Sequence, residues 1–223
     1  MKKLIISALA AVICAAALSA QDLPDNDWAH FGRYAQANSE VTAKPLAVLM
    51  GDSITDGWFS QDPDFFAANN LLGRGISGEV TSHMVVRFRR DVVDHHPKYV
   101  VILAGINDIA RNNGYIALEN TMGNIISMCE IAKANKIKPV LCTLVPSAYI
   151  RWRPALKDTK EQVAKLNEMI KEYAKAKHYK VVDYATVLAD ANGETRSDLS
   201  GDSVHPNLAG YKVMEEALMK VIR

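Results

Sequence analysis

The sequence has few cysteines and almost no excess charge of either sign. Three cysteines occur among 223 residues, and none stands with histidines at the spacing of a zinc site. The formal net charge is only +1, and no basic stripe of the kind that binds a phosphate backbone is present. These absences argue against a zinc domain and against a nucleic-acid partner. With 49% hydrophobic and 23% charged residues, the composition is that of a globular protein rather than a disordered or fibrous one.

A short run of arginines does not change this conclusion. Arg87, Arg89 and Arg90 are followed by Asp91 and Asp94, which balance their charge. We interpret the run as a solvated face of a helix.

The chain also lacks a hydrophobic run long enough for an ordinary transmembrane helix. Two lysines precede an uncharged, mostly apolar run at residues 4–18, which falls short of the roughly 20 residues that a membrane span needs. Small residues follow, so we predict a cleaved signal peptide at residues 1–20 and a secreted or periplasmic protein with no membrane span. The alternatives are a membrane anchor and a lipoprotein attached through Cys14, although Ile13 before that cysteine is not a small residue. Loss of the two lysines changes the formal charge from +1 to −1.

Two cysteines remain after cleavage, Cys129 and Cys142, and both lie in apolar surroundings. One falls on a predicted helix and the other inside a predicted strand. The sequence leaves both a disulfide and a pair of buried thiols open.

Beyond residue 43, apolar runs typical of strands alternate with segments of helical period. Several of the runs are continuous in Val, Ile and Leu, as expected for strands that are buried on both faces of a parallel sheet. No linker or internal repeat interrupts the alternation, so we predict a single domain over residues 21–223. The predicted strands are residues 45–50, 71–76, 99–104, 139–144 and 180–184.

The segments between the strands repeat their apolar residues with a period near 3.6. They predict helices at about residues 79–94, around 122–132, after a start signal at Asp158 and Glu161, and from Pro206 onward. Strands and helices that alternate in this way form an open α/β sheet of five strands, mostly parallel, with helices on both faces. Ligands in such folds bind at the carboxyl ends of the strands.

A serine follows the first predicted strand directly. Residues 51–58 read Gly-Asp-Ser-Ile-Thr-Asp-Gly-Trp, which places Ser53 at the start of the next helix. There its Oγ can face the crevice, and its backbone N–H is free to bind a developing anion. A serine at this position can equally be a helix cap, and this segment alone does not decide between the two.

The second and third predicted strands end in further candidates. Residues 73–78 read Gly-Arg-Gly-Ile-Ser-Gly, and Gly78 lets the backbone approach a ligand closely with its N–H. The same letters match a dinucleotide-binding motif, but the preceding strand is short and this is not the first strand–helix unit. The third strand leads into Asn107, whose amide can donate at the crevice, and Asp108, which we expect to brace the following helix.

A histidine and a carboxylate stand before the last predicted helix. Asp202 precedes His205 by three residues, and Pro206 follows at once. A carboxylate at this spacing can reach Nδ1 of the imidazole, fix its tautomer and stabilise its charged form. The alternative is that Asp202 only begins a turn.

Together these segments resemble the four sequence blocks of the SGNH/GDSL hydrolase family. The resemblance covers residues 51–205, through Gly-Asp-Ser, the glycine of Ile-Ser-Gly-Glu, Gly-Ile-Asn-Asp and Asp-Ser-Val-His. It implies a flavodoxin-like three-layer α/β/α sandwich with no metal or organic cofactor. The family's invariant positions correspond to Ser53, Gly78, Asn107 and His205, with Asp202 as the third member of a catalytic triad.

The resemblance implies a serine esterase in which Ser53 is the nucleophile, activated by His205 and Asp202. The oxyanion would be held by the N–H groups of Ser53 and Gly78 and by the amide of Asn107. Secretion, the resemblance and aromatic residues near the motifs together favour an acetylesterase acting on carbohydrates over a lipase, with a small-molecule or carbohydrate ester as substrate. Similarity to the platelet-activating-factor acetylhydrolase-like branch again implies a short acyl group. The alternatives are a lysophospholipase or thioesterase acting on lipids, and a catalytically silent carbohydrate-binding module.

Aromatic and basic residues near the motifs are candidates for the walls of the substrate pocket. Two follow the proposed nucleophile and three follow the fourth strand, although all could instead pack among themselves. The candidate substrate-binding residues are Trp58, Phe59, Tyr149, Arg151 and Trp152.

Overall fold

The computed structural model describes residues 27–223, so the predicted signal peptide lies outside the described residues. Within this part of the chain, no helix is both long and apolar enough to cross a membrane.

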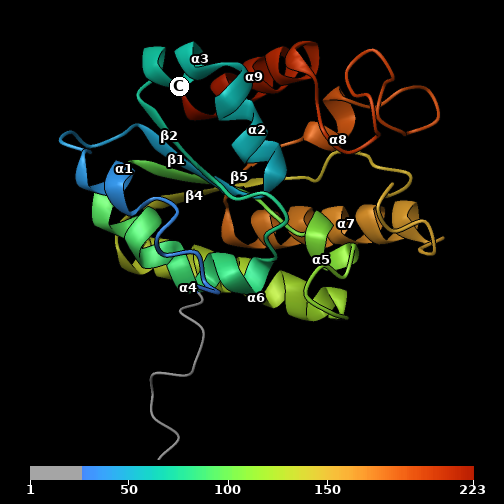
Figure 1. The fold of residues 1–223 in the computed structure, drawn as a ribbon, viewed down its shortest axis with the longest axis horizontal. Coiled ribbons are helices and arrows are strands. Elements are labelled where there is room, and N and C mark those ends of the chain that lie inside the picture. Colours follow the sequence, from blue (N-terminus) through green and yellow to red (C-terminus); the bar gives the residue numbers. More distant parts are fainter. Residues whose placement is uncertain (1–26) are drawn as a thin grey trace, which may run out of the picture.

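Five parallel strands form a single sheet in the middle of the molecule (Figure 1). The order across the sheet is β2-β1-β3-β4-β5, and each neighbouring pair is parallel. All five strands were predicted from the sequence, with each end displaced by at most two residues. The strands are β1 (Ala47–Gly51), β2 (Leu71–Gly75), β3 (Tyr99–Leu103), β4 (Lys138–Cys142) and β5 (Lys180–Val182).

The two central strands explain why the apolar runs are continuous. Every residue of β1 and of β3 is buried, because helices cover both faces of the sheet. Their register pairs Gly51 of β1 with Gly75 of β2 and with Leu103 of β3. The carboxyl ends of these three strands are therefore level, and the segments that follow them emerge along one edge of the sheet.

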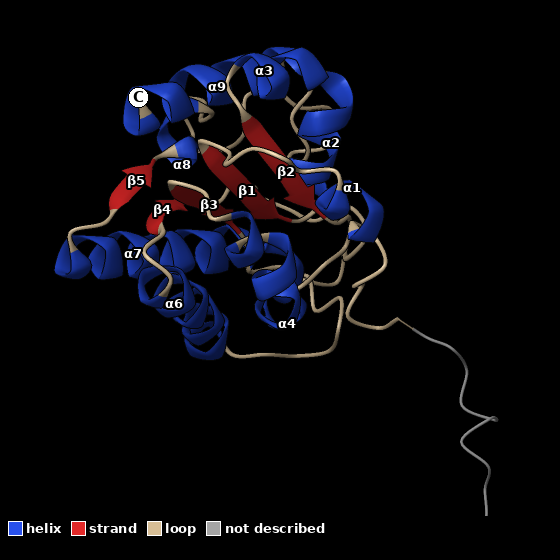
Figure 2. Ribbon diagram, turned by 90° about the vertical axis from the view of Figure 1, so that its left-hand side faces the viewer, coloured by secondary structure: helices blue, strands red, loops and turns tan. Residues whose placement is uncertain are grey.

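Helices pack on both faces and complete three layers (Figure 2). One face carries α2, α3, α8 and α9, and the other carries α4, α6 and α7. This is the predicted α/β/α sandwich, and its sheet is parallel throughout. The longer helices are α2 (Ser53–Gln61), α4 (Thr81–Asp91), α6 (Leu118–Ala134), α7 (Thr159–Lys177) and α9 (Leu208–Ile222). The shorter ones are α1 (Ala35–Ser39), α3 (Pro63–Ala68), the 3₁₀ turn η1 (Val93–His95), α5 (Ile106–Ile109) and α8 (Tyr184–Val187).

The last helix begins later than predicted. It starts at Leu208 rather than Pro206, because the side chain of Asn207 accepts a hydrogen bond from the N–H of Gly210 at 3.0 Å and caps the first turn. His205 therefore lies in the loop before the helix.

The arginine run is not a solvated face throughout, because Arg87 is fully buried. Its guanidinium donates to the carboxylates of Glu79 and Asp91 and to the carbonyl oxygen of Arg74. Only Arg89 and Arg90 of the run are exposed. The interpretation was wrong for Arg87 because its acidic partner Glu79 lies on the preceding loop, outside the helical pattern.

Cys129 and Cys142 are both free and buried, so of the two arrangements left open, the structure contains two thiols. Burial raises the pKa of the Cys129 thiol to about 12 and that of Cys142 further still.

Candidate active site

Ser53 is the first residue of α2, and only Asp52 separates it from the end of β1. Its neighbour Asp52 caps the helix by accepting a hydrogen bond from the N–H of Ile54 at 3.0 Å. Asp52 is only 1% exposed, and burial raises its pKa to about 7 despite that hydrogen bond. The cap is thus Asp52, which leaves the Ser53 hydroxyl free for another partner.

That partner is His205, which lies 152 positions later in the sequence. The Oγ atom of Ser53 is 2.8 Å from Nε2 of His205, and Nδ1 of the same ring is 2.7 Å from Oδ2 of Asp202. Both distances are those of hydrogen bonds. The structure therefore links hydroxyl, imidazole and carboxylate in one chain, in the order that nucleophilic catalysis by a serine requires.

The carboxylate of Asp202 also builds the loop that carries the histidine. Its Oδ1 accepts hydrogen bonds from the N–H groups of Val204 at 3.0 Å and of His205 at 2.7 Å. Burial raises the pKa of Asp202, but these hydrogen bonds and the contact with the His205 ring outweigh it, so the pKa lies below its ordinary value. Asp202 is an acceptor that stays ionised at neutral pH.

Gly78 and Asn107 come from the segments after β2 and β3. Gly78 is exposed and has φ of +82°, a conformation that side chains rarely allow. Asn107 is 1% exposed, and its Nδ2 donates to the carbonyl oxygen of Glu79 at 3.0 Å. The residue after Gly78 is thus tied to Asn107. Their part in an oxyanion hole remains a prediction.

Asp108 braces a different helix from the one expected. Its carboxylate accepts hydrogen bonds from the backbone N–H and the hydroxyl of Thr81, the first residue of α4. The helix that it stabilises therefore precedes it in the chain. Sequence order suggested the following helix, but the sheet places β3 so that Asp108 faces the start of α4.

Asn112 is a site residue that the sequence reasoning missed. Its Nδ2 donates to Oδ1 of Asn107 at 2.8 Å and to the carbonyl oxygen of Gly78 at 3.2 Å. Its Oδ1 accepts from Nε1 of Trp152 at 3.2 Å. No motif marks this position; the nearest signal is its place five residues after Asn107.

Trp152 is brought to the site, whereas Trp58 is not. The ring of Trp152 is 38% exposed and its centroid is 5.7 Å from that of His205. Trp58 is 1% exposed, stacks on Phe65 and Tyr211, and donates to Glu215. The expectation that Trp58 walls the pocket is wrong, because α2 turns this side chain into the core.

The remaining candidates are exposed but lie apart from this chain of contacts. Phe59 is 50% exposed and packs on Phe66 and beside Gly73 in the middle of β2, so its contact with a substrate stays a prediction. Tyr149 and Arg151 are exposed in the loop that precedes Trp152. Their contact with a substrate remains a prediction.

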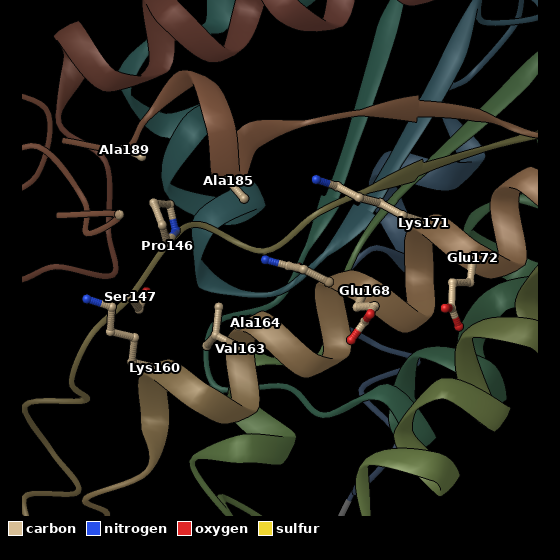
Figure 3. Close-up of a pocket in the computed structure, with 12 residues that line it drawn as sticks. Pro146, Ser147, Lys160, Val163, Ala164, Glu168, Lys171, Glu172, Ala185 and Ala189 are labelled. Atoms are coloured by element: carbon tan, nitrogen blue, oxygen red, sulfur yellow. The ribbon is translucent and has the colours of Figure 1, made fainter. Parts of the chain in front are cut away.

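Hollows in the surface are found beside Trp152 and beside α7. A hollow of about 370 Å³ adjoins Trp152 and is also lined by Ala110, Arg111 and Arg153. A larger pocket of about 570 Å³ lies between α7 and the segments that carry Pro146 and Ala185 (Figure 3). Ser53 and His205 are not among the residues that line the larger pocket.

In residues 27–223, no three His, Cys, Asp or Glu side chains gather as a metal site.

Solved structures with the same fold cover most of this chain. A GDSL-like lipase from Bacteroides thetaiotaomicron is 40% identical and has a TM-score of 0.84, over 88% of this chain and 98% of its own. An acetylxylan esterase from Geobacillus stearothermophilus, in the form of a catalytic mutant, shares the fold at 20% identity. Its TM-score is 0.65, over 81% of this chain and 94% of its own.

Sequence comparison points the same way. The chain is 26% identical over 146 residues to the uncharacterized lipoprotein YqeF of Bacillus subtilis, a match over 58% of this chain that spans only 60% of the relative's length. The sequence profile of the GDSL-like lipase/acylhydrolase family matches residues 49–213, from β1 into α9, and so includes all the strand-end segments described above. This chain belongs to the GDSL-like lipase/acylhydrolase family of ester-hydrolysing enzymes.

Proposed function

We propose that this chain is a secreted or periplasmic serine esterase that removes short acyl groups, chiefly acetyl, from carbohydrates. The observation that carries the proposal is the hydrogen-bonded chain from Ser53 through His205 to Asp202, with links of 2.8 and 2.7 Å. The proposed reaction needs no cofactor.

In the first half of the reaction, the imidazole of His205 takes the proton of the Ser53 hydroxyl while Oγ bonds to the ester carbonyl carbon. The N–H groups of Ser53 and Gly78 and the Nδ2 of Asn107 donate to the resulting oxyanion. When the tetrahedral intermediate collapses, the ester C–O bond breaks and His205 gives its proton to the departing alcohol.

In the second half, water attacks the acyl-enzyme. His205 takes a proton from the water while the water oxygen bonds to the acyl carbon. The bond between the acyl carbon and Oγ of Ser53 then breaks, and His205 returns the proton to Oγ as the acid leaves. Asp202 keeps one tautomer of the ring and stabilises the imidazolium that forms in both halves. Its lowered pKa keeps it ionised for that task.

The alcohol part of the ester meets Trp152. This ring is partly exposed and lies against the imidazole that protonates the leaving alcohol. Aromatic faces in such positions suit sugar rings, whose C–H groups pack on them. The hollow beside Trp152, with Arg111 and Arg153 in its walls, has room for further parts of a carbohydrate.

The preference for acetyl rests on similarity rather than on geometry. The motifs resemble the branch that includes platelet-activating-factor acetylhydrolase-like proteins, and two acetylxylan esterases are among the proteins of similar fold. Secretion follows from the predicted signal peptide and places the enzyme where polysaccharides occur.

The proposal is tested with the mature chain and its Ser53→Ala variant. Wild type should release acetate from acetylated xylo-oligosaccharides and should be labelled by a fluorophosphonate, whereas Ser53→Ala should do neither. Ser60→Ala is the matched control, since Ser60 is an exposed serine on the same helix. If Ser53→Ala kept wild-type turnover, the nucleophile would be another residue. A wild-type chain that binds xylan without labelling would be a carbohydrate-binding module.

A lipid-directed acylhydrolase is the second candidate, favoured by the 40% identity to a protein described as a GDSL-like lipase. A series of p-nitrophenyl esters from acetyl to dodecanoyl separates the two. A steep fall in kcat/KM with acyl length supports the acetylesterase, and a rise supports the lipid-directed enzyme.

A further inference from the structure

The side chain of Asn112 joins three parts of the active site that come from different segments. It is bonded to Trp152 in the loop after β4, to Gly78 after β2 and to Asn107 after β3. Both of its N–H hydrogens and its oxygen are used. An amide with every group engaged in this way has one defined orientation.

The outer contacts fix that orientation. The indole N–H of Trp152 can only donate, so the atom of Asn112 that faces it must be the oxygen. The carbonyl oxygen of Gly78 can only accept, so the atom that faces it must be the nitrogen. Two groups of fixed polarity thus leave the amide no alternative arrangement.

The orientation of Asn112 in turn fixes that of Asn107. Because the Nδ2 of Asn112 faces Asn107 and donates, the atom of Asn107 that accepts must be its Oδ1, at 2.8 Å from that nitrogen. The nitrogen of Asn107 then faces the carbonyl oxygen of Glu79, another group that only accepts. One of its two hydrogens is used there, and the other has no acceptor among the described residues.

We propose that Asn112 is a positioning residue that orients the amide of Asn107 as an oxyanion donor and ties it to Trp152. The role rests on the proposed function of Ser53 and adds a residue that no motif marks. The loop that meets the alcohol part of the ester is thereby connected to the group that stabilises the transition state.

A carboxylate at position 112 separates this role from simple filling of space. Asp has nearly the volume of Asn, and it still accepts from Trp152, but it cannot donate to Asn107 or to Gly78. Its oxygen would face the oxygen of Asn107 and turn that amide away from the oxyanion. A residue that only fills space would tolerate Asn112→Asp better than Asn112→Ala, whereas a positioning residue would not.

The experiment is a double-mutant cycle on p-nitrophenyl acetate with the mature chain, using Asn112→Ala, Asn107→Ala and the double variant. Asn112→Ala should lower kcat about tenfold and change KM by less than about twofold, since it loosens one of three oxyanion donors. In the Asn107→Ala background the same change should cost less than about twofold. Asn112→Asp should cost at least as much as Asn112→Ala, and the control Asn113→Ala, an exposed neighbour, should cost little.

Kinetics are read well below the unfolding midpoint of each variant, determined by circular dichroism, so that loss of folded protein does not enter. Equal losses from Asn112→Ala in both backgrounds, or no loss in either, would overturn the inference while a labelled, active wild type leaves the proposed function intact. A wild-type chain that is neither active nor labelled by a fluorophosphonate would overturn both.

Discussion

The guanidinium of Arg87 and the carboxylate of Glu79 form an ion pair in which both side chains are fully buried, next to the turn that carries Gly78. Nε of Arg87 lies 2.8 Å from each carboxylate oxygen. The same guanidinium donates to the carbonyl oxygens of Gly51 and Arg74, at 3.3 and 3.0 Å, where β1 and β2 end. This pair therefore holds together the strand ends that present Ser53 and Gly78.

Arg87→Ala should lower the free energy of unfolding by about 3–5 kcal/mol, because it leaves the carboxylates of Glu79 and Asp91 buried without their cation. Arg87→Lys should cost less, since it keeps the charge but loses the planar fork. Urea denaturation gives the values. Arg89→Ala, an exposed position on the same helix, is the control and should change little. Equal effects at the two positions would contradict the bracing role.

Asn107→Ala should leave measurable esterase activity where Ser53→Ala leaves none. Loss of one oxyanion donor typically costs about 10²–10³ in turnover, whereas loss of the nucleophile removes the covalent route. Acetate release at saturating substrate measures both variants. If Asn107→Ala kept wild-type kcat, the amide would have no contact with the oxyanion.

Asp52→Asn should stabilise the protein more as the pH rises from about 4 to 7. Burial raises the folded-state pKa of Asp52 from 3.8 to about 7, so over this range the folded protein holds a proton that the unfolded chain has released. Wild-type stability therefore declines with rising pH in this window, and the decline ends above pH 7. Asparagine caps a helix as well as aspartate does and removes the titration.

The measurement is urea denaturation of both proteins at intervals from pH 4 to pH 8. The difference in unfolding free energy should grow through this range and then level off. A difference that stays constant with pH would show that the Asp52 carboxylate is ionised in the folded protein throughout.

Trp152→Ala should raise KM for an acetylated oligosaccharide roughly three- to tenfold, and should change KM for p-nitrophenyl acetate less, because it removes an aromatic face beside the alcohol part. Steady-state kinetics on both substrates give the comparison. Trp58→Phe is the contrasting control: its ring is in the core, so it should lower stability by about 1–3 kcal/mol and leave KM unchanged. A larger KM effect from Trp58→Phe would place the pocket on the other side of Ser53.

The strands and the catalytic motifs could be predicted because their signals are local. A strand buried on both faces must be apolar along its length, as β1 and β3 are, and a residue at a strand's carboxyl end must lie at one edge of a parallel sheet. Ser53 and His205 meet as expected because Ser53 lies at the start of a helix just past a strand, and His205 lies shortly before the start of another helix.

What could not be predicted depends on partners that lie outside the local sequence pattern. Arg87 resembles a surface arginine until Glu79 is placed opposite it, and Trp58 resembles a pocket aromatic until α9 covers it with Tyr211. No motif marks Asn112, because two of its side-chain contacts are with Gly78 and Trp152, which come from other segments. The sequence shows which side chains are charged or aromatic, but it does not show whether they lie in the core or at the site.

The loop at Asp202 has a consequence for shortened chains. One carboxylate there binds both the backbone N–H and the ring of His205. The Ser53 hydroxyl that this ring contacts lies 152 residues earlier in the sequence. A chain cut before residue 205 can therefore contain β1 to β4 and Ser53 and still lack the hydrogen-bond partner of that hydroxyl. On the proposed mechanism, such a fragment has a nucleophile without a general base.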